Sequence, residues 1–128
     1  MSMKAARVLR FGPPNVITND ELPTPEPGAG QLLVRVKAAG VGHWDALIRE
    51  DKVELQRLPL ILGSELSGII EGIGADVSGF KLGDEVYGAT NEQFSGAYSA
   101  PHLLDIRIHG PNGSGCVSRS GSMTHCRP

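Results

Sequence analysis

One glycine-punctuated stretch of the chain decides the fold that the sequence predicts. It reads Gly63-Ser64-Glu65-Leu66-Ser67-Gly68, then Gly72-Ile73-Gly74, Val77, Phe80 and Gly83-Asp84-Glu85-Val86. Glycine permits a positive φ or a close approach of two backbones where a side chain would clash. The stretch therefore predicts two strands, at residues 66–73 and 85–88, joined by a turn-rich link. Val77 and Phe80 are the expected apolar anchors of this link, and Asp84 can cap its turn through the carboxylate.

Strand patterns continue toward the N-terminus. Residues 31–39 form the clearest predicted strand. In a strand, Leu32, Val34 and Val36 would face one side and the residues between them the other side. The other expected elements are strands at residues 4–11 and 16–22, a surface connection with three prolines at 23–30 and a short helix at 43–50. Many short strands separated by turns predict a mainly β barrel or sandwich with one or two short helices. No strand–helix–strand alternation is present, which argues against a parallel nucleotide-binding (Rossmann) domain.

Part of the glycine run resembles a dinucleotide fingerprint. Gly72-x-Gly74-x-x-Val77 has the first two glycines of that motif, but the third is missing. The segment also joins two strands, whereas a phosphate-binding loop opens a helix whose N-terminus meets the pyrophosphate. We therefore interpret these glycines as structural.

Composition and charge narrow the function classes. The chain has 128 residues, enough for one domain, and a formal net charge of −2, which gives no electrostatic argument for nucleic acid or an anionic membrane. No apolar run approaches the ~20 residues of a spanning helix, and the N-terminus lacks the apolar stretch of a signal peptide. We expect a cytoplasmic protein with no nucleic-acid or membrane partner.

The amino-acid composition of the chain changes near residue 100. Residues 101–128 are dense in Gly, Ser and Pro, and they contain one apolar cluster, at 103–108, that could form a strand. We expect residues from Gly110 onward to be disordered or loosely attached. The chain thus divides into a domain at 1–100 and an atypical tail at 101–128 that is disordered or foreign to the fold. Cys116, His125 and Cys126 lie in this tail, but adjacent His and Cys chelate poorly, and no metal is expected there.

Further motifs flank the glycine run, in a fixed order. Together they resemble the N-terminal catalytic domain of the medium-chain dehydrogenase/reductase family, a barrel with the GroES-like fold, over residues 3 to about 98. They are Lys4-Ala5, Pro25-x-Pro27-Gly28-x-Gly30-Gln31-Leu32-Leu33-Val34-Arg35-Val36, Ala39-Gly40-Val41, Asp45, and Pro59-x-Ile61-Leu62-Gly63-x-Glu65-x-Ser67-Gly68.

Two departures from the zinc-containing members specify the branch. Those members carry a cysteine after the Ala-Gly-Val-like segment and a histidine inside Gly-x-Glu, where this chain has Gly42 and Ser64. Neither residue is a zinc ligand. The resemblance is thus to the zinc-independent quinone and enoyl reductases. It implies hydride transfer from NADPH to a small quinone or enone acceptor, without zinc.

The resemblance also implies a set of residues that border the nicotinamide and the substrate. They are Gly42, His43, Trp44, Asp45, Ser64 and Glu65.

The residue types leave alternatives open, and His43 and Asp45 are the catalytic candidates. His43 can donate a proton to a reduced oxygen, or it can be a surface residue at a helix start. Trp44 can stack on a flat ring or line the core or a cleft. Asp45 can act in the site or cap the first helical turn. Glu65 follows an apolar segment and must be paired or near solvent. The family resemblance implies that it has a support role behind the site.

Members of the family continue into a nucleotide-binding domain, which residues 99–128 do not supply. We therefore expect a truncated enzyme that is inactive as the isolated chain. An exposed sheet edge would then favour self-association. The alternative is a stand-alone GroES-like binding or assembly module without catalysis.

Overall fold

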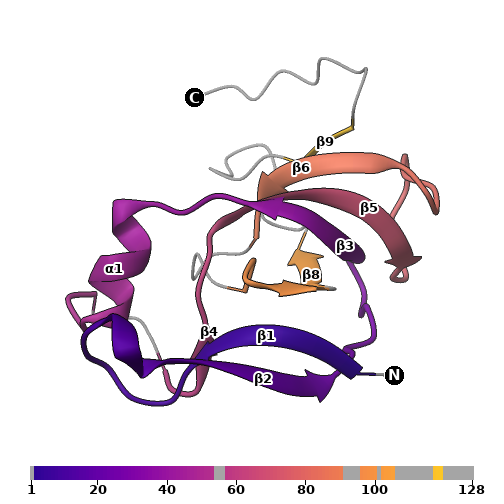
Figure 1. The fold of residues 1–128 in the computed structure, drawn as a ribbon. Coiled ribbons are helices and arrows are strands. Elements are labelled where there is room, and N and C mark those ends of the chain that lie inside the picture. The colour runs from indigo at the N-terminus through magenta and orange to yellow at the C-terminus, as the bar shows by residue number, and fades with distance from the viewer. Residues whose placement is uncertain (1, 54–56, 91–95, 101, 106–116, 120–128) are drawn as a thin grey trace.

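Antiparallel strands dominate the computed structural model, which describes residues 2–53, 57–90, 96–100, 102–105 and 117–119 (Figure 1). The strands are β1 (Ser2–Val8), β2 (Ile17–Pro23), β3 (Gln31–Ala39), β4 (Leu60–Ile61), β5 (Glu65–Ile73), β6 (Glu85–Ala89), β7 (Ser99–Ala100), β8 (His102–Asp105) and β9 (Val117–Arg119). The described residues also form a 3-10 helix, η1 (Pro14–Val16), and one α-helix, α1 (His43–Arg49). The mainly β class with one or two short helices is confirmed.

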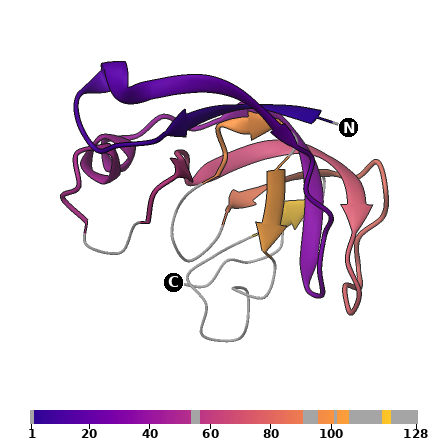
Figure 2. The ribbon, with the colours of Figure 1, turned by 90° about the horizontal axis from the view of Figure 1, so that it is seen from below.

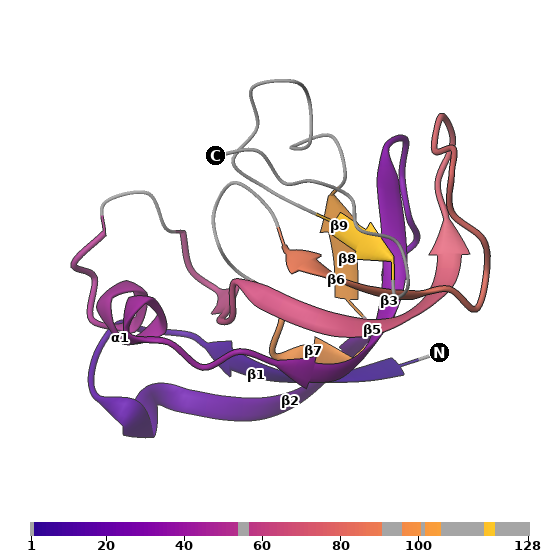
Figure 3. The same cartoon turned by 90° about the horizontal axis from the view of Figure 1, so that it is seen from above.

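The strands of the described residues form two curved sheets. In the first, β2, β1 and β4 are neighbours in that order, and β7 also pairs with β1. In the second, the order is β8-β3-β5-β6-β9. Figures 1 and 3 show α1 at one end of the molecule and the turn after β5 at the opposite end. The view from below in Figure 2 shows the same separation, so the start of α1 lies far from the glycine-rich turn.

The alternation of β3 sets the inner face of the second sheet. Leu32 and Val34 are fully buried, whereas Arg35 and Lys37 are exposed, as their spacing predicts. The buried residues form two clusters. One comprises Leu32, Val34, Leu66, Ile70, Val86 and Ala97, and the other comprises Val8, Val16, Ile48, Leu60 and Leu62. The half-buried ring of Tyr98 packs against both clusters and thereby connects them.

The glycine run forms the expected strand, turn and strand. Gly68 lies on β5 opposite Val36 of β3, and a Cβ atom at Gly68 would overlap the carbonyl oxygen of Arg35. Only glycine therefore permits the close approach of β3 and β5 at this point.

The turn itself is anchored as expected. Val77 and Phe80 pack against the first cluster, and the Lys81 N–H donates to the Asp84 carboxylate at 2.9 Å, which caps the turn. Gly72 lies in β5 and Gly74 in the turn, and no helix begins there. The structural interpretation of these glycines is confirmed.

Two short strands, β4 and β7, were not predicted. Each has two residues, which is too short for a two-residue period to be visible. The strand within residues 103–108 is confirmed in part by β8.

The tail differs from the sequence-based expectation at one point. β9 pairs with β6, although we expected residues from Gly110 onward to be loosely attached. The outer edge of β6 offers unpaired backbone groups, which three extended residues satisfy. The division of the chain at residue 100 stays a prediction. Cys116, His125 and Cys126, at which we expect no metal, lie outside the described residues.

Candidate acceptor site at the start of the α-helix

The predicted site residues lie at and beside the start of α1. The helix begins after Gly42, whose extended backbone makes it the N-cap. Asp45 occupies the first turn and is buried, with 5% of its surface exposed. The Gly42 N–H donates to Oδ2 of Asp45 at 2.9 Å, and the Asp45 N–H donates to the Gly42 carbonyl at 3.2 Å. A first-turn carboxylate also interacts favourably with the helix dipole.

Asp45 accepts hydrogen bonds from two further segments. The Gly63 N–H donates to Oδ1 at 3.0 Å, and the Tyr98 hydroxyl donates to Oδ2 at 3.0 Å. These donors are 18 and 53 residues away along the chain. Both carboxylate oxygens are thus engaged. This geometry favours the structural alternative for Asp45 over direct chemistry on a substrate.

Tyr98 is the member of this site that sequence reasoning missed. Its ring lies against Gly63, whose φ is +98° and where a Cβ would lie only 2.6 Å from Cδ1 of Tyr98. The hydroxyl also lies 3.3 Å from the Gly40 carbonyl. Burial, together with the hydrogen bond to Asp45 and the negative charge of Asp45, raises the pKa of Tyr98 to about 12.

This pKa shift predicts a titration. In a Tyr87→Phe variant Tyr98 is the only tyrosine, so tyrosinate absorbance reports its ionisation, with a midpoint expected near pH 12. Asp45→Asn should lower the midpoint because it removes the charge that disfavours tyrosinate. The raised pKa means that the folded state holds the phenolic proton more tightly than the unfolded chain. The resulting stability is complete below pH 10 and is lost as the pH rises toward 12. A midpoint near pH 10 in the folded protein would contradict this assignment.

The other end of α1 is also fixed. Nε of Arg49 donates to the Gly12 carbonyl at 3.0 Å, and the Gly12 N–H donates to the Arg49 carbonyl at 2.9 Å. Ile48 is fully buried in the second cluster. With both ends held, the helix presents His43 and Trp44 on a rigid support. His43 is exposed, and Trp44 is 43% exposed, so Trp44 is not a core residue.

Ser64 and Glu65 follow Gly63 directly. The Ser64 carbonyl accepts a hydrogen bond from the Thr90 N–H at 2.9 Å. Glu65 is exposed and lies beside Gly40, whose N–H donates to the Glu65 carbonyl at 3.0 Å. We expected Glu65 to be paired or near solvent because it follows an apolar segment, and its exposed side chain is near solvent. In the described part of the chain, no hydrogen bond joins His43 to Asp45, Ser64 or Glu65.

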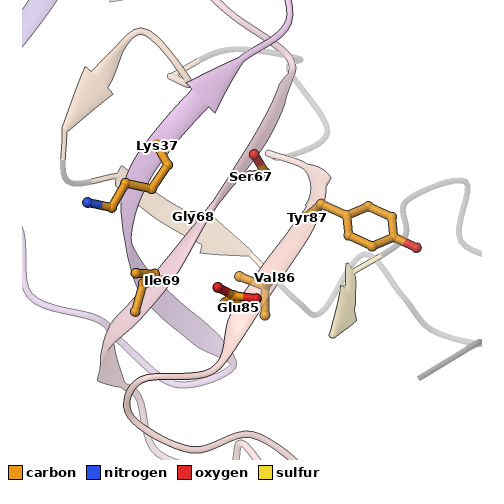
Figure 4. Close-up of a pocket in the computed structure, with 7 residues that line it drawn as sticks. All are labelled: Lys37, Ser67, Gly68, Ile69, Glu85, Val86 and Tyr87. Atoms are coloured by element: carbon orange, nitrogen blue, oxygen red, sulfur yellow. The ribbon is translucent and has the colours of Figure 1, made fainter. Parts of the chain in front are cut away.

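Two pockets lie on the second sheet. One, of about 580 Å³, includes Glu65 and is lined by Ala38, Ala39, Gly40, Glu65, Leu66, Ser67, Tyr87, Gly88 and Ala89. The other, of about 410 Å³, is shown in Figure 4 and is lined by Lys37, Ser67, Gly68, Ile69, Glu85, Val86 and Tyr87. The second pocket contains none of the predicted site residues. In Figure 4 the Tyr87 ring and the Lys37 ammonium point away from one another, so they do not converge on one ligand position.

Two properties of the described residues bear on possible metal ions and membranes. No three His, Cys, Asp or Glu side chains in these ranges gather closely enough to hold a metal ion. No helix in the same ranges is long and apolar enough to span a membrane. The absence of zinc and the cytoplasmic localisation stay predictions.

Comparisons with known proteins agree with this fold. Residues 28–126 match the alcohol dehydrogenase GroES-like domain. A quinone oxidoreductase of Lama guanicoe is 38% identical over 99 residues, which are 76% of this chain and 29% of that protein. The solved human synaptic vesicle membrane protein VAT-1 homolog-like protein superposes with a TM-score of 0.82 at 28% identity, over 98% of this chain and 37% of its own.

A second solved structure is an enzyme with its nucleotide. The quinone oxidoreductase of Escherichia coli complexed with NADPH has a TM-score of 0.74 at 29% identity, over 80% of this chain and 31% of its own. The chain thus spans about a third of the length of the proteins that it matches. It belongs to the alcohol dehydrogenase GroES-like domain family, and its relatives are quinone oxidoreductase-like medium-chain dehydrogenases/reductases.

Proposed function

We propose that this chain is the acceptor-side domain of a zinc-independent, NADPH-dependent reductase that acts on a quinone or an enone. The observation that carries the proposal is the identity of 35–38% with curated quinone oxidoreductases across the segment that contains the site. Because the chain covers only 29–34% of those proteins, we assign it one wall of the site and expect no turnover by the isolated chain.

The described residues do not by themselves form a binding site for a dinucleotide. The glycines that resemble a phosphate loop belong to β5 and its turn, and no helix N-terminus follows them to receive a pyrophosphate. In this proposal the nucleotide therefore binds residues other than those described. NADPH is chosen over NADH by family resemblance alone.

The chain's own residues supply the acceptor wall. Trp44 is half-exposed and offers a flat apolar face to a planar ring. His43 is exposed at the first helical position, where it can donate a hydrogen bond or a proton to a carbonyl oxygen that gains negative charge. Asp45 holds both neighbours on a fixed backbone. Positioning an electron-poor acceptor in this way is the main task of a protein without metal or nucleophile chemistry.

Trp44 makes the proposal testable because it is the only tryptophan. We expect duroquinone, whose methylated ring does not add to the cysteines, to quench Trp44 fluorescence with saturation in the micromolar to millimolar range typical of enzyme substrates. His43→Ala should weaken this binding about threefold to tenfold, which corresponds to the free energy of one lost hydrogen bond. Lys37→Ala, in the pocket of Figure 4, is the matched control and should have no effect.

Other outcomes would contradict the assignment. Linear quenching equal to that of free N-acetyltryptophanamide would show collisions instead of a site. Weaker binding in Lys37→Ala together with normal binding in His43→Ala would place the quinone in the pocket shown in Figure 4 and not at the start of α1. A defined ring oligomer that binds neither duroquinone nor NADPH would favour the stand-alone assembly module.

A further inference from the structure

Contacts fix both the backbone and the ring of Tyr98. Its N–H donates to the Leu62 carbonyl at 2.9 Å, and its carbonyl accepts from the Ala6 N–H at 2.9 Å, so its backbone is held on both sides. Its ring packs against both hydrophobic clusters. The hydroxyl is therefore held in one position relative to the two sheets. A group that is hydrogen-bonded to it is held in place in turn.

The hydroxyl has one proton and two acceptors nearby. The Asp45 carboxylate is nearer, at 3.0 Å, than the Gly40 carbonyl, at 3.3 Å, and it carries a charge. The proton therefore goes to Asp45. The acceptor atom is Oδ2, the same oxygen that receives the Gly42 N–H at the start of the helix. The chain of contacts thus runs from Tyr98 through Asp45 to the residue that begins α1.

We infer that Tyr98 is a positioning residue of the acceptor site: through Asp45 it sets the first turn of α1 and hence the placement of His43 and Trp44. The inference rests on the proposed function. Tyr98 needs no contact with the acceptor, since Asp45 and Gly40 lie around its hydroxyl. Neither sequence motifs nor the family resemblance assigns it this role.

The test compares Tyr98→Phe with Tyr87→Phe. Both variants remove one hydroxyl and keep the ring, but Tyr87 is 54% exposed on β6. The first readout needs no ligand: the single indole N–H signal in an NMR spectrum of the labelled chain. We expect this signal to shift or broaden in Tyr98→Phe and to stay in place in Tyr87→Phe. The second readout is duroquinone quenching, which should weaken about tenfold in Tyr98→Phe only.

The outcomes separate the two proposals. A folded Tyr98→Phe protein with the wild-type indole signal and quenching overturns the positioning role. If the wild-type chain shows no saturable quenching but the indole signal moves in Tyr98→Phe, the quinone site fails while Tyr98 still sets the turn. Should Tyr98→Phe not fold, Asp45→Asn takes its place. It keeps the side-chain volume and an acceptor for Gly63, and an unchanged indole signal in this variant overturns the inference.

Discussion

Replacing Asp45 with alanine is expected to destabilise the domain by about 3–5 kcal/mol, because it removes the acceptor of one buried and two partly buried donors. The Gly42 N–H, the Gly63 N–H and the Tyr98 hydroxyl all donate to this carboxylate. A buried donor that loses its partner costs about 1–3 kcal/mol. The first turn of α1 also loses its acidic residue, worth about 0.3–1 kcal/mol. The melting temperature should fall by roughly 12 °C or more in a domain of this size.

The matched control removes a carboxylate that is not buried. Asp20 pairs with Arg7 at 2.8 Å, but both side chains are partly exposed, at 30% and 26%. Asp20→Ala should therefore cost at most about 1 kcal/mol. Urea unfolding followed by circular dichroism measures both variants without relying on Trp44. Equal losses in the two variants would show that the hydrogen bonds of Asp45 contribute little.

The second large effect is expected at Gly68. In Gly68→Ala the new Cβ would overlap the Arg35 carbonyl oxygen and lie 2.7 Å from Cγ1 of Val34. A backbone carbonyl cannot rotate away as a side chain can, so β3 and β5 must separate at the centre of the second sheet. We expect a loss of about 3 kcal/mol or more, at the upper end of overpacking substitutions. Faster amide exchange in β3 and β5 should accompany it.

Gly79→Ala provides the comparison for this effect. Gly79 has a φ of +85°, but a Cβ there would meet no atom within 4 Å. Its substitution therefore measures backbone strain alone, about 1–2 kcal/mol. Urea midpoints of the two variants give the difference directly. If Gly79→Ala were the more damaging substitution, close approach of β3 and β5 would not be the reason for glycine at position 68.

The extent to which the fold follows from the sequence depends on element length. β3 has nine residues, and its alternation predicted both its bounds and its buried face. The turn after β5 carries its own signals in glycine, Val77, Phe80 and Asp84, and the anchoring and capping that they predict are confirmed. β4 and β7 have two residues each, and they exist because β1 offers an edge to pair with. Such strands are consequences of tertiary structure and leave no periodic signal in the sequence.

The site follows a similar rule. The contact of Asp45 with Gly42 spans three residues and is a local property of a helix start, so sequence reasoning could anticipate it. Its contacts with Gly63 and Tyr98 join segments that only the sheets bring together. Tyr98 carried no motif that pointed to a partner, and only its place in the fold reveals one. The roles of His43 and Trp44 stay predictions, since exposure alone does not assign a function.

The carboxylate of Asp45 also imposes an order on folding. Its local partner is available as soon as α1 can form, whereas Tyr98 is synthesised 53 residues later. A nascent chain can therefore pair β1 with β2 and β3 with β5 while Asp45 still lacks its most distant donor. Contacts between residues far apart in sequence form late because closing long loops costs entropy. The start of α1 thus gains its last hydrogen-bond donor only after Tyr98 has been made, so the order of this turn depends on the folding of the first hundred residues.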